Sequence, residues 1–205
     1  MVRQARVEYR IVAGQREIPH LPSCSLLTNM IFKETPLNGA FIIEPERLED
    51  ERGFFARTWD QQEFEAHGLN PRVVQCNTSF NTERGTLRGM HYQAAPYEEA
   101  KLVRCTRGSI YDVIIDLHRD STTFKRWAAA ELTADNYRMH YIPEGFAHGF
   151  LTLEERTEVS YQMSQFYVPT SARGVRWDDP AFGIQWPIAV RVISDRDKNY
   201  PDFTL

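Results

Sequence analysis

The chain has 205 residues, 42% of them hydrophobic and 12% aromatic, enough for one substantial core without requiring a second domain. Its 24 basic and 28 acidic side chains leave a formal charge of −4 with no dense basic run, which argues against nucleic acid as a partner. No apolar run approaches the roughly 18 residues of a membrane span. Three cysteines, Cys24, Cys76 and Cys105, have no paired spacing and fit a reducing compartment. We therefore expect a soluble, cytoplasmic protein.

The first 29 residues differ in charge from the rest of the chain. They carry Arg3, Arg6, Arg10 and Arg16 against two glutamates, and they lack the apolar core of a secretory signal. We expect residues 1–29 to be a poorly ordered leader or an upstream extension, with a transit peptide as the alternative. Residues 30–205 are then expected to form a single domain.

Most of residues 30–205 reads as short β-strands. Residues 30–37 form the first, closed by Pro36. Later segments rich in Val, Ile, Tyr and Phe are separated by Gly, Pro, Asn or Asp: 39–43, 72–75, 101–104, 109–117, 138–142 and 158–163. Many short strands separated by turns are typical of a sandwich, a barrel or a jelly roll.

One helix is predicted, beginning after Asp60. Asp60 can serve as its N-cap, Glu63 three residues later can complete a capping box, and Gly68 provides a stop.

Two histidine segments indicate a site. His91 in residues 87–93 and His148 in residues 143–150 each lie beside glycine in an apolar and aromatic run. This is the context in which strands of a barrel direct side chains into a shared interior. Arg88 and His91 would face opposite ways on a regular strand, so a bulge at Gly89 is expected to bring both into the cavity.

Alternation places Lys101, Val103 and Cys105 on one face of a strand, and Val159, Tyr161 and Met163 on one face of another. An inward Lys101 would need a partner and would suggest an anionic or enolate-bearing ligand. An outward Lys101 would be an ordinary solvated side chain. The pattern leaves both interpretations open.

A metal site is the first chemical hypothesis. Metal-binding cupins use a His-x-His pair, a later acid and another histidine. Gln93 takes the second position of that pair here, and Glu98 and Glu99 lie in what reads as a surface turn. Because two histidines, His91 and His148, rarely hold a catalytic metal, we expect no metal and no cofactor, and keep a metal-dependent cupin oxygenase or isomerase as an alternative.

Proton transfer without a metal is the second hypothesis. Removing a proton beside a carbonyl requires an oriented base and an electrophile for the enolate, and inversion requires an acid on the opposite face. His91 can be the base, Asp197 can fix its tautomer, Lys101 can stabilise the enolate, and Tyr161 can return the proton.

Seven motifs resemble those of one known family and follow one another in the same order. They are residues 50–55, 75–79, 87–93, 101–105, 111–117, 143–150 and 177–180. Over residues 30–203 the chain resembles the dTDP-4-dehydrorhamnose 3,5-epimerase family, whose members are metal-independent, cupin-type jelly rolls. The resemblance implies a mainly β double-stranded β-helix, or jelly roll, with a few short helices.

The resemblance also implies catalytic roles. His91 would remove the C3 and C5 protons of a 4-keto sugar, and Asp197 would orient it. Lys101 would stabilise the enolate near the C4 carbonyl, and Tyr161 would be the general acid.

Substrate-binding positions follow in the same way. Arg52 and Arg88 match arginines that bind diphosphate and sugar, which suits their planar, bidentate donors. Phe166 would stack on the nucleotide base. The further expected positions are Phe55, Arg57, Gln75, Asn77 and His148.

Three departures affect specificity. Arg57 stands where better-known members have glutamate, Gln162 where lysine is usual, and Phe166 where tyrosine is common. They leave open the nucleotide base and the choice between single and double epimerisation.

The resemblance implies a nucleotide-sugar epimerase of rhamnose-type deoxysugar biosynthesis, acting as a homodimer whose N-terminal segments pair and contribute to the partner's pocket. The alternatives are a nucleotide-sugar 3,4-ketoisomerase and a noncatalytic sugar-nucleotide-binding cupin.

Overall fold

The computed structural model describes residues 29–204, so nearly all of the expected leader lies outside the described residues. The strands within this range are β1 (Met30–Glu34), β2 (Phe41–Pro45), β3 (Arg47–Asp50), β4 (Gly53–Ala56), β5 (Gln75–Asn81), β6 (Thr86–Gln93), β7 (Lys101–Arg107), β8 (Ser109–Asp116), β9 (Trp127–Thr133), β10 (Met139–Ile142), β11 (Phe146–Thr152), β12 (Thr157–Met163), β13 (Ala172–Gly174) and β14 (Val192–Ile193). The helices are α1 (Gln61–Ala66) and α2 (Asp195–Lys198).

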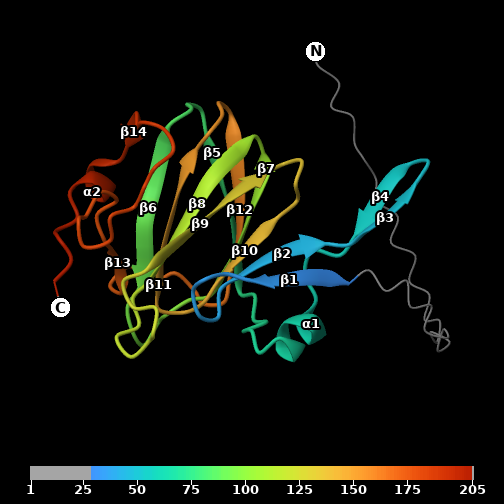
Figure 1. Ribbon diagram of the computed structural model, residues 1–205, viewed down its shortest axis with the longest axis horizontal. Helices are drawn as coiled ribbons and strands as arrows, with labels where there is room; N and C mark the ends of the chain where they lie inside the picture. Colours follow the sequence, from blue (N-terminus) through green and yellow to red (C-terminus); the bar gives the residue numbers. More distant parts are fainter. Residues whose placement is uncertain (1–28, 205) are drawn as a thin grey trace, which may run out of the picture.

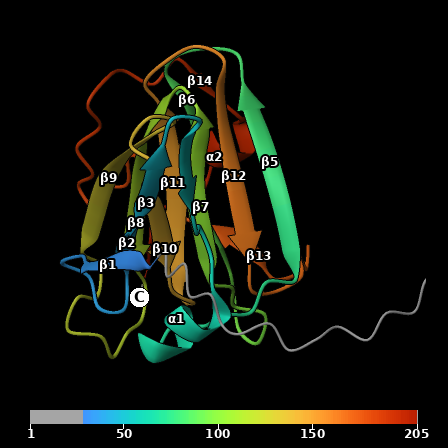
Figure 2. The same cartoon turned by 90° about the vertical axis from the view of Figure 1, so that its right-hand side faces the viewer.

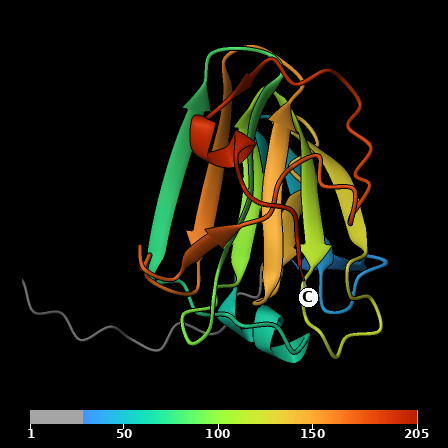
Figure 3. The same cartoon turned by 90° about the vertical axis from the view of Figure 1, so that its left-hand side faces the viewer.

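Two large sheets make up the body of the molecule. One has the order β1-β2-β10-β7-β12-β5, and the other has the order β13-β6-β11-β8-β9, with β14 added parallel to β6. Figures 2 and 3 show the long strands of both sheets running alongside one another, with α1 at one end of them. This arrangement confirms the mainly β, jelly-roll fold that the sequence predicts.

The main core lies between the two sheets. Val103 and Cys105 of β7 and Val159 of β12 are fully buried and pack with Ile114 of β8 and Phe150 of β11. The shared face predicted for Lys101, Val103 and Cys105 is therefore confirmed, and it points inward. Tyr161 packs at the edge of the same cluster, which confirms the predicted face of β12.

Several predicted strands are wrong in their bounds, since β1 ends at Glu34 and β2 covers Phe41–Pro45. Residues 72–75 were expected to be a strand, but β5 begins only at Gln75. The Asn70 side chain accepts a hydrogen bond from the Arg72 N–H, which forms a local turn in place of strand pairing. Conversely, the predicted strands do not include β3, β4, β9, β13 or β14, and the alanine-rich sequence of β9 has low strand propensity.

The predicted helix is present as α1. Asp60 caps it by accepting from the Gln62 and Glu63 N–H groups, and Gly68 follows its end with a φ of +69°. The reciprocal half of the capping box is wrong, because the Glu63 carboxylate accepts from the Met30 N–H instead. Helix α2, capped by Ser194, was not predicted. Among the described residues, no helix is long and apolar enough to cross a membrane.

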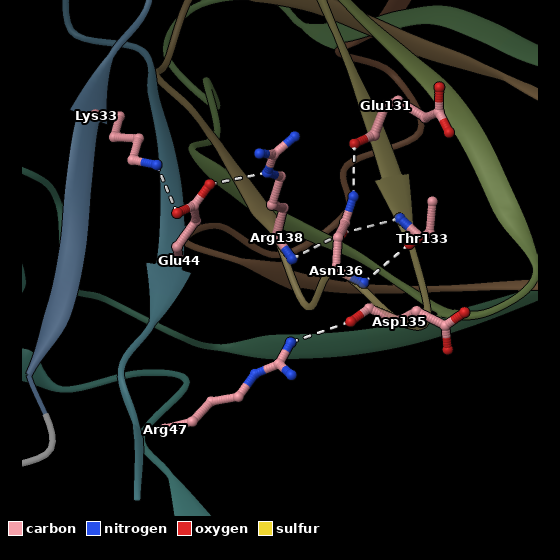
Figure 4. A network of polar contacts seen from close by, with 8 residues as sticks. All are labelled: Lys33, Glu44, Arg47, Glu131, Thr133, Asp135, Asn136 and Arg138. Carbon is pink, nitrogen blue, oxygen red and sulfur yellow. Dashed lines mark hydrogen bonds and ion pairs between the residues drawn. The ribbon is translucent and has the colours of Figure 1, made fainter.

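The β3–β4 hairpin stands apart from the two large sheets (Figure 1). Its base is attached to the turn between β9 and β10 (Figure 4): Arg47 of β3 donates to the Asp135 carbonyl at 3.0 Å. Glu44 of the preceding strand accepts from both Lys33 and Arg138. These contacts fix where the hairpin leaves the body of the molecule.

Candidate active site

A cavity of about 730 Å³ opens between the two sheets. Eight of the predicted site residues line it: Gln75, Asn77, Arg88, His91, Lys101, His148, Tyr161 and Asp197. They come from both sheets and from the C-terminal segment, so residues far apart in the sequence share one space.

A bulge in β6 directs two of these side chains into the cavity. Arg88 is opposite Phe150 and His91 is opposite His148, so two residues of β6 face only Gly149 between them. Gly89 has a φ of +151°, and a Cβ there would lie 2.5 Å from the Gly149 Cα. Only glycine permits this close approach. The bulge predicted at Gly89 is confirmed.

His91 is held by a carboxylate from the far end of the chain. Its Nε2 lies 2.7 Å from Asp197 Oδ1. Pairing of β14 with β6 brings α2, which carries Asp197, beside His91 (Figure 1). Burial works to raise the pKa of Asp197, but hydrogen bonds from His91 and from the Gly89 N–H outweigh it and lower that pKa. An ionised Asp197 accepts from His91 Nε2–H, which leaves Nδ1 as the basic nitrogen.

Lys101 points inward, which settles the question that the sequence pattern left open. Its side chain is 7% exposed, and its Nζ lies 3.0 Å from Glu99 Oε1. Nζ also donates to the His91 carbonyl at 3.2 Å. The ammonium thus lies against the strand that carries the histidine.

The expected surface position of Glu99 is wrong. Glu99 is buried at the cavity wall, because the Gln93 side chain donates to its Oε2 at 3.2 Å and to the Tyr97 carbonyl at 2.9 Å. Gln93, which the sequence singled out only as a missing metal ligand, therefore folds this turn inward.

Tyr161 belongs to the wall opposite His91, since β12 and β6 are in different sheets. Its Oη lies 2.9 Å from Ser79 Oγ, and burial raises the pKa of Tyr161, which keeps the phenol protonated. Ser79 was not predicted as a site residue.

His148 shares a carboxylate with a second histidine. Asp112 accepts from His148 Nε2 at 2.7 Å and from His140 Nδ1 at 2.8 Å, and all three side chains are buried. Burial lowers the pKa of His148; it works to raise that of Asp112, but the two histidines outweigh it and the pKa of Asp112 is lowered. The sequence did carry a signal for Asp112, which is one of two acids within the apolar strand 109–117.

Four predicted site residues do not line this cavity. Arg52 pairs with Asp50 on the β3–β4 hairpin, where Phe55 is 64% exposed. Arg57 pairs with acids at the start of α1. The Phe166 side chain is 56% exposed, although its neighbours Gln165 and Tyr167 line the cavity. Arg52 and Phe55 thus belong to the projecting hairpin, Arg57 lies beside α1, and Phe166 lies at the cavity mouth.

The two cavity histidines each use Nε2 to contact a carboxylate, Asp197 for His91 and Asp112 for His148. Within residues 29–204, no three side chains of histidine, cysteine or acid gather as a group that could hold a metal ion.

Comparison with known proteins confirms the resemblance seen in the motifs. The family model described as dTDP-4-dehydrorhamnose 3,5-epimerase matches residues 34–204. A dTDP-4-dehydrorhamnose 3,5-epimerase of Methanothermobacter thermautotrophicus is 44% identical over 82% of this chain and 92% of its own.

Solved structures of proteins with this family name are also similar to this chain. The dTDP-4-dehydrorhamnose 3,5-epimerase of Elizabethkingia anophelis superposes with a TM-score of 0.83 at 40% identity, covering 85% of this chain and 96% of that one. The Bacillus anthracis enzyme of the same name, with TDP and PPi bound, gives a TM-score of 0.82 at 40% identity and covers 85% and 100%.

Proposed function

Because the chain belongs to the dTDP-4-dehydrorhamnose 3,5-epimerase family, we propose that it inverts C3 and C5 of a nucleoside-diphosphate 4-keto-6-deoxyhexose in rhamnose-type deoxysugar biosynthesis. One observation carries the proposal. A carboxylate-held histidine on one wall of the cavity faces a wall that supplies a protonated tyrosine and a buried lysine.

The base is His91. Its Nδ1 removes the proton from a carbon next to the C4 carbonyl, while Asp197 holds the tautomer and stabilises the imidazolium that forms. C3 and C5 both adjoin that carbonyl, so one base serves both centres in succession.

Lys101 and Tyr161 complete the inversion. The ammonium of Lys101 stabilises negative charge on the enolate oxygen, where a preorganised cation is most effective. The Tyr161 phenol, on the wall opposite His91, returns a proton to the other face of the carbon. The substrate's own carbonyl is the electron sink, so we propose no cofactor.

Substrate binding is proposed for the polar side chains around this set. Arg88, held at 2.7 Å by Asn81 Oδ1, suits the diphosphate or sugar oxygens. Gln75, Asn77 and His148 line the remaining wall, and Phe166 at the mouth would stack on the base. Binding the nucleotide diphosphate remotely holds the sugar ring in reactive geometry.

We further propose that residues 30–205 act as one domain of a cytoplasmic homodimer. The projecting hairpin exposes Phe54, Phe55 and Leu48, and its base is fixed by the contacts in Figure 4. A projecting hairpin that exposes several large apolar side chains is suited to a protein interface. In such a dimer, Arg52 and Phe55 would reach the partner's pocket, with Arg57 near its edge.

The proposed function is tested by product analysis. Purified protein is given dTDP-4-keto-6-deoxyglucose with a strong chelator, and the sugar is followed by ¹H NMR. Inversion at C3 and C5 supports the proposal. Movement of the carbonyl to C3 would instead show a 3,4-ketoisomerase, binding without turnover a noncatalytic module, and loss of activity in chelator a metal-dependent cupin. Affinities for the dTDP, CDP, GDP and UDP series identify the base.

A further inference from the structure

Lys101 and Glu99 form an ion pair in a setting where charges are costly. Both side chains are 7% exposed, and their charged atoms lie 3.0 Å apart at the cavity wall. A buried ion pair contributes little net stability, and apolar residues of similar volume often replace such pairs without loss. The pairing is better explained by the cavity than by folding.

Glu99 is itself held in place from several sides. Gln93 Nε2 donates to Glu99 Oε2 and also to the Phe166 carbonyl, and Gln93 Oε1 accepts from the Val168 N–H at 2.6 Å. The next residue, Ala100, donates its N–H to Ser164 Oγ at 2.7 Å. The carboxylate therefore cannot follow Lys101 if the lysine moves.

The acceptors that the Lys101 ammonium contacts determine where its free N–H donor points. A lysine ammonium has three N–H donors. One contacts Glu99 and a second the His91 carbonyl, so both known bonds lie along the wall. The third donor remains for an oxygen in the cavity.

We propose that Glu99 is a positioning residue for the epimerisation, which holds the Lys101 ammonium at the cavity wall and directs its remaining donor to the C4 oxygen of the sugar. The inference rests on the proposed function, in which Lys101 stabilises the enolate. Other titratable and charged groups share the cavity with Lys101: His91 and Arg88 from β6, His148 from β11 with Asp112 behind it, and Tyr161 from β12. Glu99 is the acid that contacts the ammonium directly.

The test compares two neighbouring glutamates. Glu99→Gln keeps the shape and an acceptor oxygen but removes the charge, and Glu98→Gln is the matched control, because Lys101 pairs with Glu99. Glu99→Asp tests whether a carboxylate at a shorter reach restores part of the effect. Steady-state kinetics over a range of pH give kcat and KM, and thermal melting confirms that each variant is folded.

We expect Glu99→Gln to lower kcat by about 10- to 100-fold, as expected when a catalytic group is misplaced, with KM little changed. Glu98→Gln should match the wild type, and Glu99→Asp should regain part of the loss. A Glu99→Gln protein with wild-type kcat would overturn the proposal.

A second readout does not depend on turnover. The chain has only four lysines, so ¹³Cε-labelled lysine gives a simple NMR spectrum in which Lys101 is identified by its loss in Lys101→Arg. The Lys101 signal should move in Glu99→Gln, because the ammonium loses its carboxylate partner, and an unchanged signal would overturn the proposed role of Glu99. A wild-type protein without epimerase activity would contradict the proposed function, while this spectrum would still show whether Glu99 acts on Lys101.

Discussion

His91 Nε2 lies 2.7 Å from Asp197 Oδ1, although the two residues are 106 positions apart in the sequence. The contact depends on parallel pairing of β14 with β6, which docks the C-terminal segment against the strand that carries the histidine. The proposed base is therefore oriented only when the end of the chain is folded onto the jelly roll.

Asp197→Asn tests this orientation. Asparagine can donate to Nε2 and so favours the wrong tautomer, and we expect kcat to fall by about 10²- to 10⁴-fold. The affinity for dTDP should stay close to that of the wild type. Asp195→Asn, an exposed acid on the same helix, is the control and should leave kcat unchanged. Equal kcat for both variants would refute an orienting role.

Tyr161→Phe separates the two halves of the inversion. Removing the phenol leaves His91 and Asp197 in place, so proton removal continues while delivery to the opposite face is lost. We expect deuterium exchange from D₂O to persist and net inversion to slow by about 10²- to 10⁴-fold. Tyr111→Phe, outside the cavity, is the control. Equal losses of exchange and inversion in Tyr161→Phe would argue against the acid role.

Gly89→Ala tests the bulge. Its Cβ would lie 2.5 Å from the Gly149 backbone, whereas a Cβ at Gly53, which also has positive φ, meets nothing within 4 Å. Gly53→Ala is therefore the control. Both variants carry backbone strain, but only Gly89→Ala adds overpacking, which typically costs about 1–3 kcal/mol. Urea unfolding should show the larger loss for Gly89→Ala. Similar losses would mean that φ alone requires the glycine.

The stability of the protein should depend on pH through His148. Burial lowers the pKa of His148 from its ordinary 6.5. Below pH 6.5 the unfolded chain then binds a proton that the folded chain does not, so stability present at neutral pH is lost as pH falls from 6.5 toward the folded pKa. The free energy of unfolding should decrease by up to about 1.4 kcal/mol per pH unit.

His148→Gln serves as the comparison. Its unfolding free energy should vary less between pH 6.5 and 5, even if its stability at pH 7 is lower. The pKa values of Asp112 and Asp197, which are lowered from 3.8, act in a more acidic window and do not blur the comparison. An identical slope in both proteins would contradict a neutral, buried His148.

The sequence predicts the fold well where residue type and period agree. Alternation correctly groups Val103 with Cys105 on one face and Val159 with Tyr161 on another, but it does not say which face points inward. The alanine-rich β9 was missed because its pairing with β8, and not its propensity, makes it a strand.

The site could be predicted only in part, for a physical reason. His91, Lys101 and Tyr161 could be chosen by their chemistry, but nothing near Glu99 in the sequence shows that Gln93 turns it inward. Asp112 required knowing that two histidines on other strands meet it. Arg52 and Phe55 illustrate the converse, because their motif matches the family although both lie on the β3–β4 hairpin and do not line this cavity.

The measurement that tests the central claim most directly is deuterium incorporation at C3 and C5 of dTDP-4-keto-6-deoxyglucose in D₂O, compared between the wild type and His91→Ala. If His91 is the single base for both centres, the wild type incorporates deuterium at both carbons and His91→Ala at neither, while dTDP binding is retained. Label entering either carbon at the wild-type rate in His91→Ala would show that another group removes the proton.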